Sequence, residues 1–187
     1  MTIFKANDIR GVYGKDLHDH DAYILGNAFV QFTKSKQIIV GRDNRLSSPA
    51  LHRALLKGIT DAGADVLDIG IIDSPGAYFS SHHFKRPVMM ITASHNPPQH
   101  NGFYLCKTDA VSIYQDNGIN QIEKLMKSNK LIKNKKGKVI AKDIWRLYTK
   151  HILSFVDNKK IKPLTIVVDA GNGVGSLIAT RVFNEIP

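Results

Sequence analysis

The sequence predicts a layered α/β fold. Three short runs rich in β-branched residues, 37–41, 65–70 and 88–92, have the length and composition of buried strands. Segments with helical spacing of apolar residues stand between them, and this strand and helix alternation is typical of α/β layers. The chain has 187 residues, of which 43% are hydrophobic, so it is long enough to bury a core of one domain or slightly more.

The first expected helix spans Asp19 to Lys34, with Asp19 or Asp21 available as its N-cap. The strand 37–41 follows and ends at a glycine. A loop then leads to a second expected helix, in which Ser48 caps the start and Pro49 takes the first helical position. This helix should run to about Asp61, because Gly63 is a typical helix stop.

The strand 65–70 comes next, followed by a third expected helix over 75–84 and by the strand 88–92. The remaining elements alternate less regularly, and the lysine-rich stretch 129–138 between two of them is expected to be a loop. These remaining elements, in chain order, are a short strand over 103–106, a helix over 116–127 and a helix over 143–156.

The C-terminal residues are expected to begin a second unit. We predict a first domain over 1–157, a linker over 158–163 and the start of a second α/β domain over 164–187, with a strand over 164–169 and a helix over 174–184. One strand and one helix cannot form a core by themselves. We therefore expect exposed apolar surface there, which favours self-association.

The net charge of +10 arises mainly from one segment. Eight lysines and no acidic residue occur from Lys124 to Lys142. Such a segment is usually a solvated surface, and it lacks the arginines and interleaved aromatics of a nucleic-acid reader, so no nucleic-acid partner is expected. No apolar run is long enough for a membrane helix, and the single cysteine, Cys106, excludes an internal disulfide, so we expect a cytoplasmic protein with no membrane partner.

The heptapeptide TASHNPP, residues 92–98, carries the strongest chemical signal. It follows the strand 88–92, which should deliver Ser94 to the carboxyl edge of the sheet, where open α/β folds usually bind ligands. The two prolines restrict the residues before them, so the loop is rigid. Asn96 and the backbone amides could donate hydrogen bonds to phosphate oxygens, and His95 could donate or move a proton.

Three other interpretations of this loop are open. Ser94 and His95 are chain neighbours without the flanking glycines of a nucleophile elbow, which argues against acyl transfer. Ser, Asn and Pro could simply build a tight turn. A metal site made of histidines would lack the carboxylate or cysteine ligands that usually accompany them.

The whole heptapeptide, followed by Asn-Gly-Phe at 101–103, resembles the phosphoserine loop of the α-D-phosphohexomutases, closest to the phosphomannomutase/phosphoglucomutase branch. Three further segments resemble that family in the same order, namely FKANDIRG at 4–11, VGRDNRLS at 40–47 and VVDAGNG at 167–173. The resemblance implies a layered mixed sheet with helices on both faces, as in the family's first domain, and then the first strand and helix of a second α/β domain.

The resemblance also implies an activity. The enzyme would be an isomerase that moves phosphate between O6 and O1 of a hexose phosphate through a sugar bisphosphate. Ser94 would carry the phosphoryl group and one oxygen of a Mg²⁺ site. Arg10, His95 and Asn96 would act on phosphate, sugar or proton, and Lys107 is a candidate phosphate ligand.

Two departures from the family pattern bear on this activity. The family's metal loop, DGDxDR, has no counterpart here, so the remaining Mg²⁺ ligands are expected to be absent, and the chain alone is expected to be inactive. Tyr104 stands where the family usually has lysine, and Lys107 is the nearest possible substitute. The alternative is therefore a non-catalytic module that binds phosphosugars or phosphate. For Arg10 and for Arg42, simple ion pairs with Asp8 and Asp43 are the plainer interpretation.

Overall fold

The computed structural model describes residues 3–128, 130–157 and 160–186. It divides into two compact units, Met1–Lys142 and Asp143–Pro187, which are treated separately below. The expected linker begins with Asn158 and Lys159, which lie outside the described residues. The expected domain limits at 157 and 164 remain a prediction.

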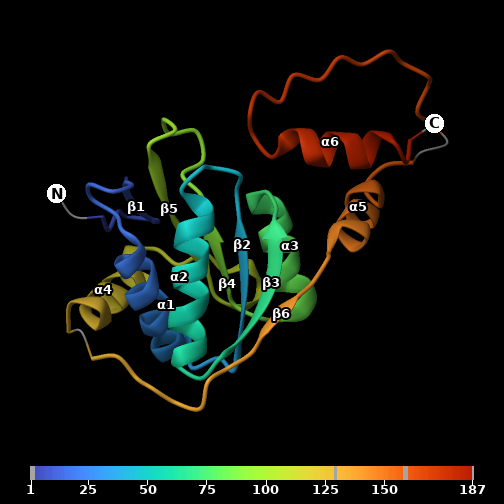
Figure 1. Cartoon of the computed structure of the whole chain (residues 1–187). Helices are drawn as coiled ribbons and strands as arrows, with labels where there is room; N and C mark the ends of the chain where they lie inside the picture. The colour runs from blue at the N-terminus through green and yellow to red at the C-terminus, as the bar shows by residue number, and fades with distance from the viewer. Residues whose placement is uncertain (1–2, 129, 158–159, 187) are drawn as a thin grey trace. The chain divides into compact units, whose positions relative to one another are not determined.

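A six-stranded mixed sheet forms the centre of the first unit (Figure 1). Its spatial order is β1-β5-β4-β2-β3-β6. The strands β4, β2, β3 and β6 run parallel to one another, whereas β5 is antiparallel to both β4 and β1. The strand bounds are β1 Ile9–Val12, β2 Gln37–Arg42, β3 Asp65–Ile71, β4 Val88–Ile91, β5 His100–Cys106 and β6 Val139–Ala141.

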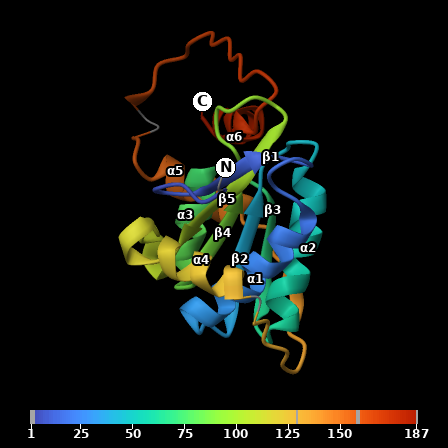
Figure 2. The same ribbon diagram turned by 90° about the vertical axis from the view of Figure 1, so that its left-hand side faces the viewer.

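Helices cover both faces of this sheet, which confirms the predicted fold class. Figure 2 shows α1 and α2 on one face and α3 on the other. The helices of this unit are α1 Asp19–Thr33, α2 Ser48–Asp61, α3 Ser74–Phe84 and α4 Ile119–Ser128. Over the described residues, no helix is both long and apolar enough to cross a membrane.

The main core lies between the sheet and the pair α1 and α2. Ile38 and Val40 of β2 and Met89 and Ile91 of β4 belong to it, because alternate residues of a strand point to the same face. The two helices approach so closely that a Cβ atom added to Gly58 would lie 2.0 Å from the Tyr23 carbonyl oxygen. A residue with a side chain at position 58 would therefore not fit at this separation of the two helices.

Two helix starts differ from the sequence-based expectation. His18, not Asp19 or Asp21, is the N-cap of α1, and Asp21 instead accepts a hydrogen bond from the His18 backbone N–H at 2.8 Å. Ser47, not Ser48, is the N-cap of α2. Ser48 is fully buried and donates its hydroxyl to Asp43, five residues before it in the chain.

Two strands of the sheet were not predicted. Each of β1 and β6 lies at an edge and has only three or four residues, too few for a clear alternating pattern. The helix expected over 116–127 begins later, at Ile119, after a short 3₁₀ turn at Gln115–Asn117. The strand expected over 103–106 is longer than predicted and starts at His100.

The second unit contains the helices α5, Trp145–Leu153, and α6, Gly175–Phe183. The Arg181 guanidinium lies 4.2 Å from the centre of the Trp145 ring, a cation–π contact between these helices. The strand expected over 164–169 does not form, since its residues are exposed and pair with no other strand in the part of the chain that the structure describes. A β-strand needs a hydrogen-bonded neighbour.

We predict that Gly58→Ala lowers the free energy of unfolding by about 1–3 kcal/mol, because the added methyl group forces α1 and α2 apart. Urea unfolding of the full chain measures this difference. Arg53→Ala, on the exposed side of the same helix, should change the stability by less than about 0.5 kcal/mol. Alanine has a higher helix propensity than glycine, so Gly58→Ala would stabilise the protein if the close helix contact were absent. A stabilised variant would therefore contradict the prediction.

Candidate active site

The loop 92–99 connects β4 to β5 at the carboxyl edge of the parallel strands. At this edge it meets the first turn of α3 and Arg10 of β1, which pairs with Gly102 across the sheet. A pocket of about 180 Å³ opens between them. Its lining residues are Asp8, Arg10, Ser74, Tyr78, Thr92, Ser94, Phe103 and Tyr104. The structure therefore brings together two residues that the sequence singled out, Ser94 and Arg10.

Ser94 is exposed and has a left-handed backbone conformation, with φ of 52°. Its N–H donates a hydrogen bond to the Thr92 hydroxyl oxygen at 3.0 Å. Residues other than glycine rarely adopt this conformation, and those that do often belong to functional sites. The conformation presents the Ser94 side chain at the pocket.

Arg10 is the cation of the pocket wall. Its Nη2 donates to the Asp8 carboxylate at 2.5 Å, so the ion pair considered as the plainer interpretation is present. Its Nε is buried and finds no hydrogen-bond acceptor among the residues that the structure describes. A buried donor without an acceptor is costly, and an oxygen of a bound ligand would satisfy it.

His95 and Asn96 take different places in the loop. His95 is exposed and does not line the pocket. The backbone N–H and the side-chain Nδ2 of Asn96 both donate to the Ala93 carbonyl oxygen, at 3.0 and 2.9 Å. Asn96 thus closes the turn of the loop with one of its side-chain donors.

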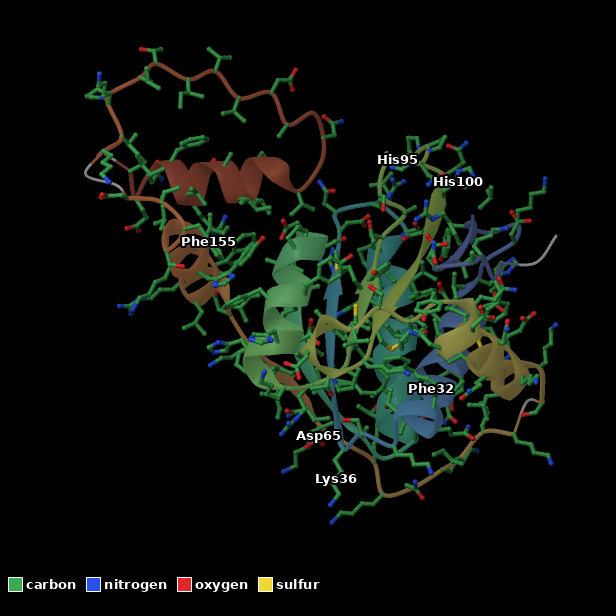
Figure 3. The ribbon with its side chains drawn as sticks, turned by 180° about the vertical axis from the view of Figure 1, so that it is seen from behind. Phe32, Lys36, Asp65, His95, His100 and Phe155 are labelled. Carbon is green, nitrogen blue, oxygen red and sulfur yellow. The ribbon has the colours of Figure 1, made fainter. Side chains whose placement is uncertain are left out.

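Lys107 lies away from this site. Strand β5 is antiparallel to β4, with Phe103 opposite Ile91 and Cys106 opposite Val88, so Lys107 follows the far end of the pair. Its ammonium lies 5.5 Å from the centre of the Phe32 ring. Figure 3 shows Phe32 at the end of the sheet opposite His95. The expectation that Lys107 could replace a lysine at position 104 is therefore wrong, because the direction of β5 carries it away.

Tyr78, which the sequence interpretation missed, and Tyr104 form another wall of the pocket. The Tyr78 and Tyr104 rings lie with their centres 5.3 Å apart, and the Tyr104 hydroxyl is hydrogen-bonded to the Ser112 hydroxyl. Burial, followed by the influence of Tyr104, raises the pKa of Tyr78 above its usual value. Tyr78 is thus a neutral phenol at physiological pH. No local pattern could indicate it, because it comes from α3.

Arg45 was also missed. The expected ion pair of Arg42 with Asp43 does not form as predicted: Arg42 donates to the Asp43 backbone carbonyl oxygen, and the Asp43 carboxylate accepts from Arg45 Nε at 3.2 Å. The other guanidinium nitrogens of Arg45 donate to backbone carbonyls of the loop that carries Ser94. The only available signal was its place within the segment 40–47.

The described residues do not form a complete metal site. Within 3–128, 130–157 and 160–186, no group of three or more His, Cys, Asp or Glu side chains lies close enough to hold a metal ion. Asp8, the carboxylate that lines the pocket, is paired with Arg10. The hydroxyl oxygen of Ser94 is by itself too little to hold Mg²⁺.

We predict that the free energy of unfolding falls as the pH rises above about 10, the ordinary tyrosine pKa. The folded-state pKa of Tyr78 is raised, so its contribution is complete below that pH and is lost as the pH rises through the folded-state pKa. Tyr78→Phe should weaken this fall. Urea unfolding at several alkaline pH values measures it.

The influence of Tyr104 on the pKa of Tyr78 predicts a change in the titration of Tyr78. Tyr104→Phe removes the hydroxyl group through which Tyr104, after burial, raises the pKa of Tyr78, so Tyr78 should then ionise at lower pH. The ultraviolet absorbance of tyrosinate, corrected by subtracting the Tyr78→Phe variant, follows it. An unchanged Tyr78 titration in Tyr104→Phe would contradict the assigned cause.

Comparison with known proteins identifies the family to which the sequence of this chain is similar. Residues 1–133 match the family described as phosphoglucomutase/phosphomannomutase, alpha/beta/alpha domain I. The chain is 35% identical over 186 residues to a phosphomannomutase of Escherichia coli strain K12 and 38% identical over 191 residues to a phosphoglucomutase of Neisseria meningitidis serogroup B. These matches take in 97% and 98% of this chain, but only 41% and 40% of the relatives.

A solved structure gives the same result. The crystal structure of a phosphoglucomutase/phosphomannomutase family protein from Burkholderia thailandensis superposes with a TM-score of 0.87 at 36% sequence identity. The superposition covers 98% of this chain and 42% of that one. The chain therefore spans about two fifths of the length of the relatives that it matches.

Proposed function

The chain belongs to the phosphoglucomutase/phosphomannomutase family, and on this premise we propose that Ser94 carries the phosphoryl group in a hexose phosphate mutase. The observation that carries the proposal is the placement of Ser94. It is an exposed hydroxyl, held in a left-handed conformation, at a pocket that also contains Arg10 with a buried free Nε.

The transfer has two symmetric halves. A hydroxyl oxygen of the hexose monophosphate attacks the phosphorus of phospho-Ser94, the bond from phosphorus to Ser94 Oγ breaks, and the proton of the attacking hydroxyl passes by way of a base to the released Ser94 Oγ. The resulting bisphosphate then turns over and returns its other phosphoryl group to Ser94 Oγ. The net change moves phosphate between O6 and O1. Such transfers need positioning and cationic stabilisation more than covalent chemistry by the protein.

Arg10 is the residue of this chain that stabilises the transferred group. The free Nε of its guanidinium can donate to a phosphate oxygen while Nη2 stays on Asp8. The rings of Tyr78 and Tyr104 form one wall of the pocket and add no cation to it. His95 is the proposed proton carrier, because it follows Ser94 directly in the chain and its side chain is exposed.

A divalent cation is part of the proposal only through the Ser94 phosphate. Mg²⁺ would neutralise charge on the transferred group, and a phosphate oxygen of phospho-Ser94 would be the ligand that this chain supplies. The described residues do not complete such a site. Activity therefore requires ligands beyond the residues described, and we propose that this chain by itself accepts phosphate but does not turn over.

Incubation with glucose 1,6-bisphosphate and Mg²⁺ tests the carrier role. We expect intact-mass spectrometry of the full chain to detect one added phosphate, located at Ser94 by peptide mapping and missing in Ser94→Ala. The control variant Ser128→Ala, at an exposed serine at the end of α4, keeps Ser94 and should be phosphorylated like the original chain. Lack of phosphate on the original chain would favour the alternative of a non-catalytic module that binds phosphosugars.

Arg10→Gln should slow the phosphorylation of Ser94 by about 10²-fold, because it removes a cationic donor from the transferred phosphate. The rate follows from intact mass against time. Arg53→Gln removes a cation from the exposed surface of α2 and should leave the rate unchanged. Equal rates in Arg10→Gln and the original chain would assign Arg10 to the Asp8 ion pair alone.

A further inference from the structure

Arg45 is attached to the Ser94 loop and the start of β5 by both terminal nitrogens of its guanidinium. Its Nη2 donates to the carbonyl oxygens of Ser94 and Asn96, each at 2.8 Å. Its Nη1 donates to the carbonyl oxygens of Pro97 and His100, at 2.8 and 3.1 Å. With Nε bound to Asp43, all five N–H groups of the side chain are used.

Asp43 fixes the orientation of this arginine. Its carboxylate accepts hydrogen bonds from the Arg45 Nε and backbone N–H, at 3.2 and 3.1 Å, and from the Ser48 hydroxyl at 2.5 Å. The two side chains are mostly buried, with 12% of Asp43 and 14% of Arg45 exposed. The arginine charge is therefore neutralised by a carboxylate, and no donor is left to bind a phosphate.

Asn101, the second residue of β5, attaches the strand that follows this loop. It is fully buried, and its Nδ2 donates to the hydroxyl oxygens of Ser47 and Ser48, at 2.8 and 3.0 Å. Its Oδ1 accepts from the Gly102 backbone N–H at 2.8 Å. The residues that follow β2 thus hold both the loop that follows β4 and the start of β5.

The left-handed conformation of Ser94 needs such support, because an unfavourable backbone conformation persists only where its surroundings determine it. Within the loop, the bond from the Ser94 N–H to Thr92 restrains one side of the residue. The bond from Arg45 to the Ser94 carbonyl oxygen restrains the other. Together they fix the peptide groups on both sides of Ser94.

We propose that Arg45 is the positioning residue for phosphoryl transfer to and from Ser94, acting by holding the loop backbone so that the Ser94 hydroxyl faces the phosphoryl donor. The proposal rests on the carrier role of Ser94 proposed above. Arg45 touches neither the donor nor the phosphate in this assignment. Its removal should therefore slow the transfer without changing how tightly the donor binds.

The substitution Arg45→Lys is the decisive variant, because lysine keeps the charge beside Asp43 but has three donors on one nitrogen and cannot reach four carbonyls in fork geometry. We expect the rate of Ser94 phosphorylation by glucose 1,6-bisphosphate to fall by about 10²-fold at saturation. The donor concentration at half saturation should change less than about twofold, because Arg45 does not contact the donor and its replacement leaves the binding of the donor unchanged. Arg42→Lys, which loses a single bond to the Asp43 carbonyl oxygen, is the matched control and should keep the original rate.

A second variant separates positioning from misfolding. Arg45→Ala leaves space for a small cation, and added guanidinium, at concentrations far below those that unfold proteins, should restore part of the phosphorylation rate. Methylammonium has the charge without the planar fork and should not. Hydrogen exchange of the backbone amides 93–102 should rise in both Arg45 variants, while that of α2 and β4 stays as in the original chain.

The outcomes are distinguishable. If the original chain takes no phosphate at Ser94, the carrier role itself fails. If the original chain is phosphorylated and Arg45→Lys reacts equally fast, the carrier role stands and the positioning proposal is overturned. It is also overturned if the loop amides exchange faster while the rate is unchanged, or if the half-saturating concentration rises and the saturated rate does not fall.

Discussion

The parallel register of β2 and β4 is the constraint on which the site depends. Arg42 pairs with Ile91 at the ends of these strands, and the Asp43 N–H donates to the Ile91 carbonyl oxygen at 2.9 Å. The loops that leave the two strands therefore start side by side at one edge of the sheet. Such an edge is the common ligand site of open α/β sheets. Here one of the two loops presents Ser94, and the other supplies the arginine that holds it.

The antiparallel strand β5 decides which side chains surround this loop. It turns back beside β4 and pairs with β1, and this pairing brings Arg10 next to Gly102 and so to the pocket. The same reversal carries Lys107 to the opposite end of the sheet. Among the residues that line the pocket, Arg10 is the cation, and Tyr104 lies beside Tyr78 with its ring tilted against that of Tyr78. The pocket combines one cation with a neutral aromatic wall.

Two arginines at this edge of the sheet, Arg10 and Arg45, are each paired with an aspartate but differ in the number of free hydrogen-bond donors. Arg45 has every donor engaged by protein oxygens, so it can only hold structure. Arg10 keeps a buried Nε without an acceptor in the described part of the chain, so it can still receive an oxygen of a ligand. Counting donors thus separates a positioning arginine from a binding arginine. Charge alone would treat them as equivalent.

The sequence by itself determined the α/β class, the family resemblance and the central strands β2, β3 and β4, because hydrophobic periodicity and local turn residues are properties of neighbouring residues. It also identified the loop of Ser94 and the basic residue Arg10, through short motifs. Only the tertiary structure decided the edge strands β1 and β6, the direction of β5 that removes Lys107, and the attachment of Arg45 to the Ser94 loop. These features depend on contacts between residues far apart in the chain. The four bonds from Arg45 span about fifty positions of sequence, as in the pair of Arg45 with Ser94, separated by 49, and no local pattern encodes such a distance.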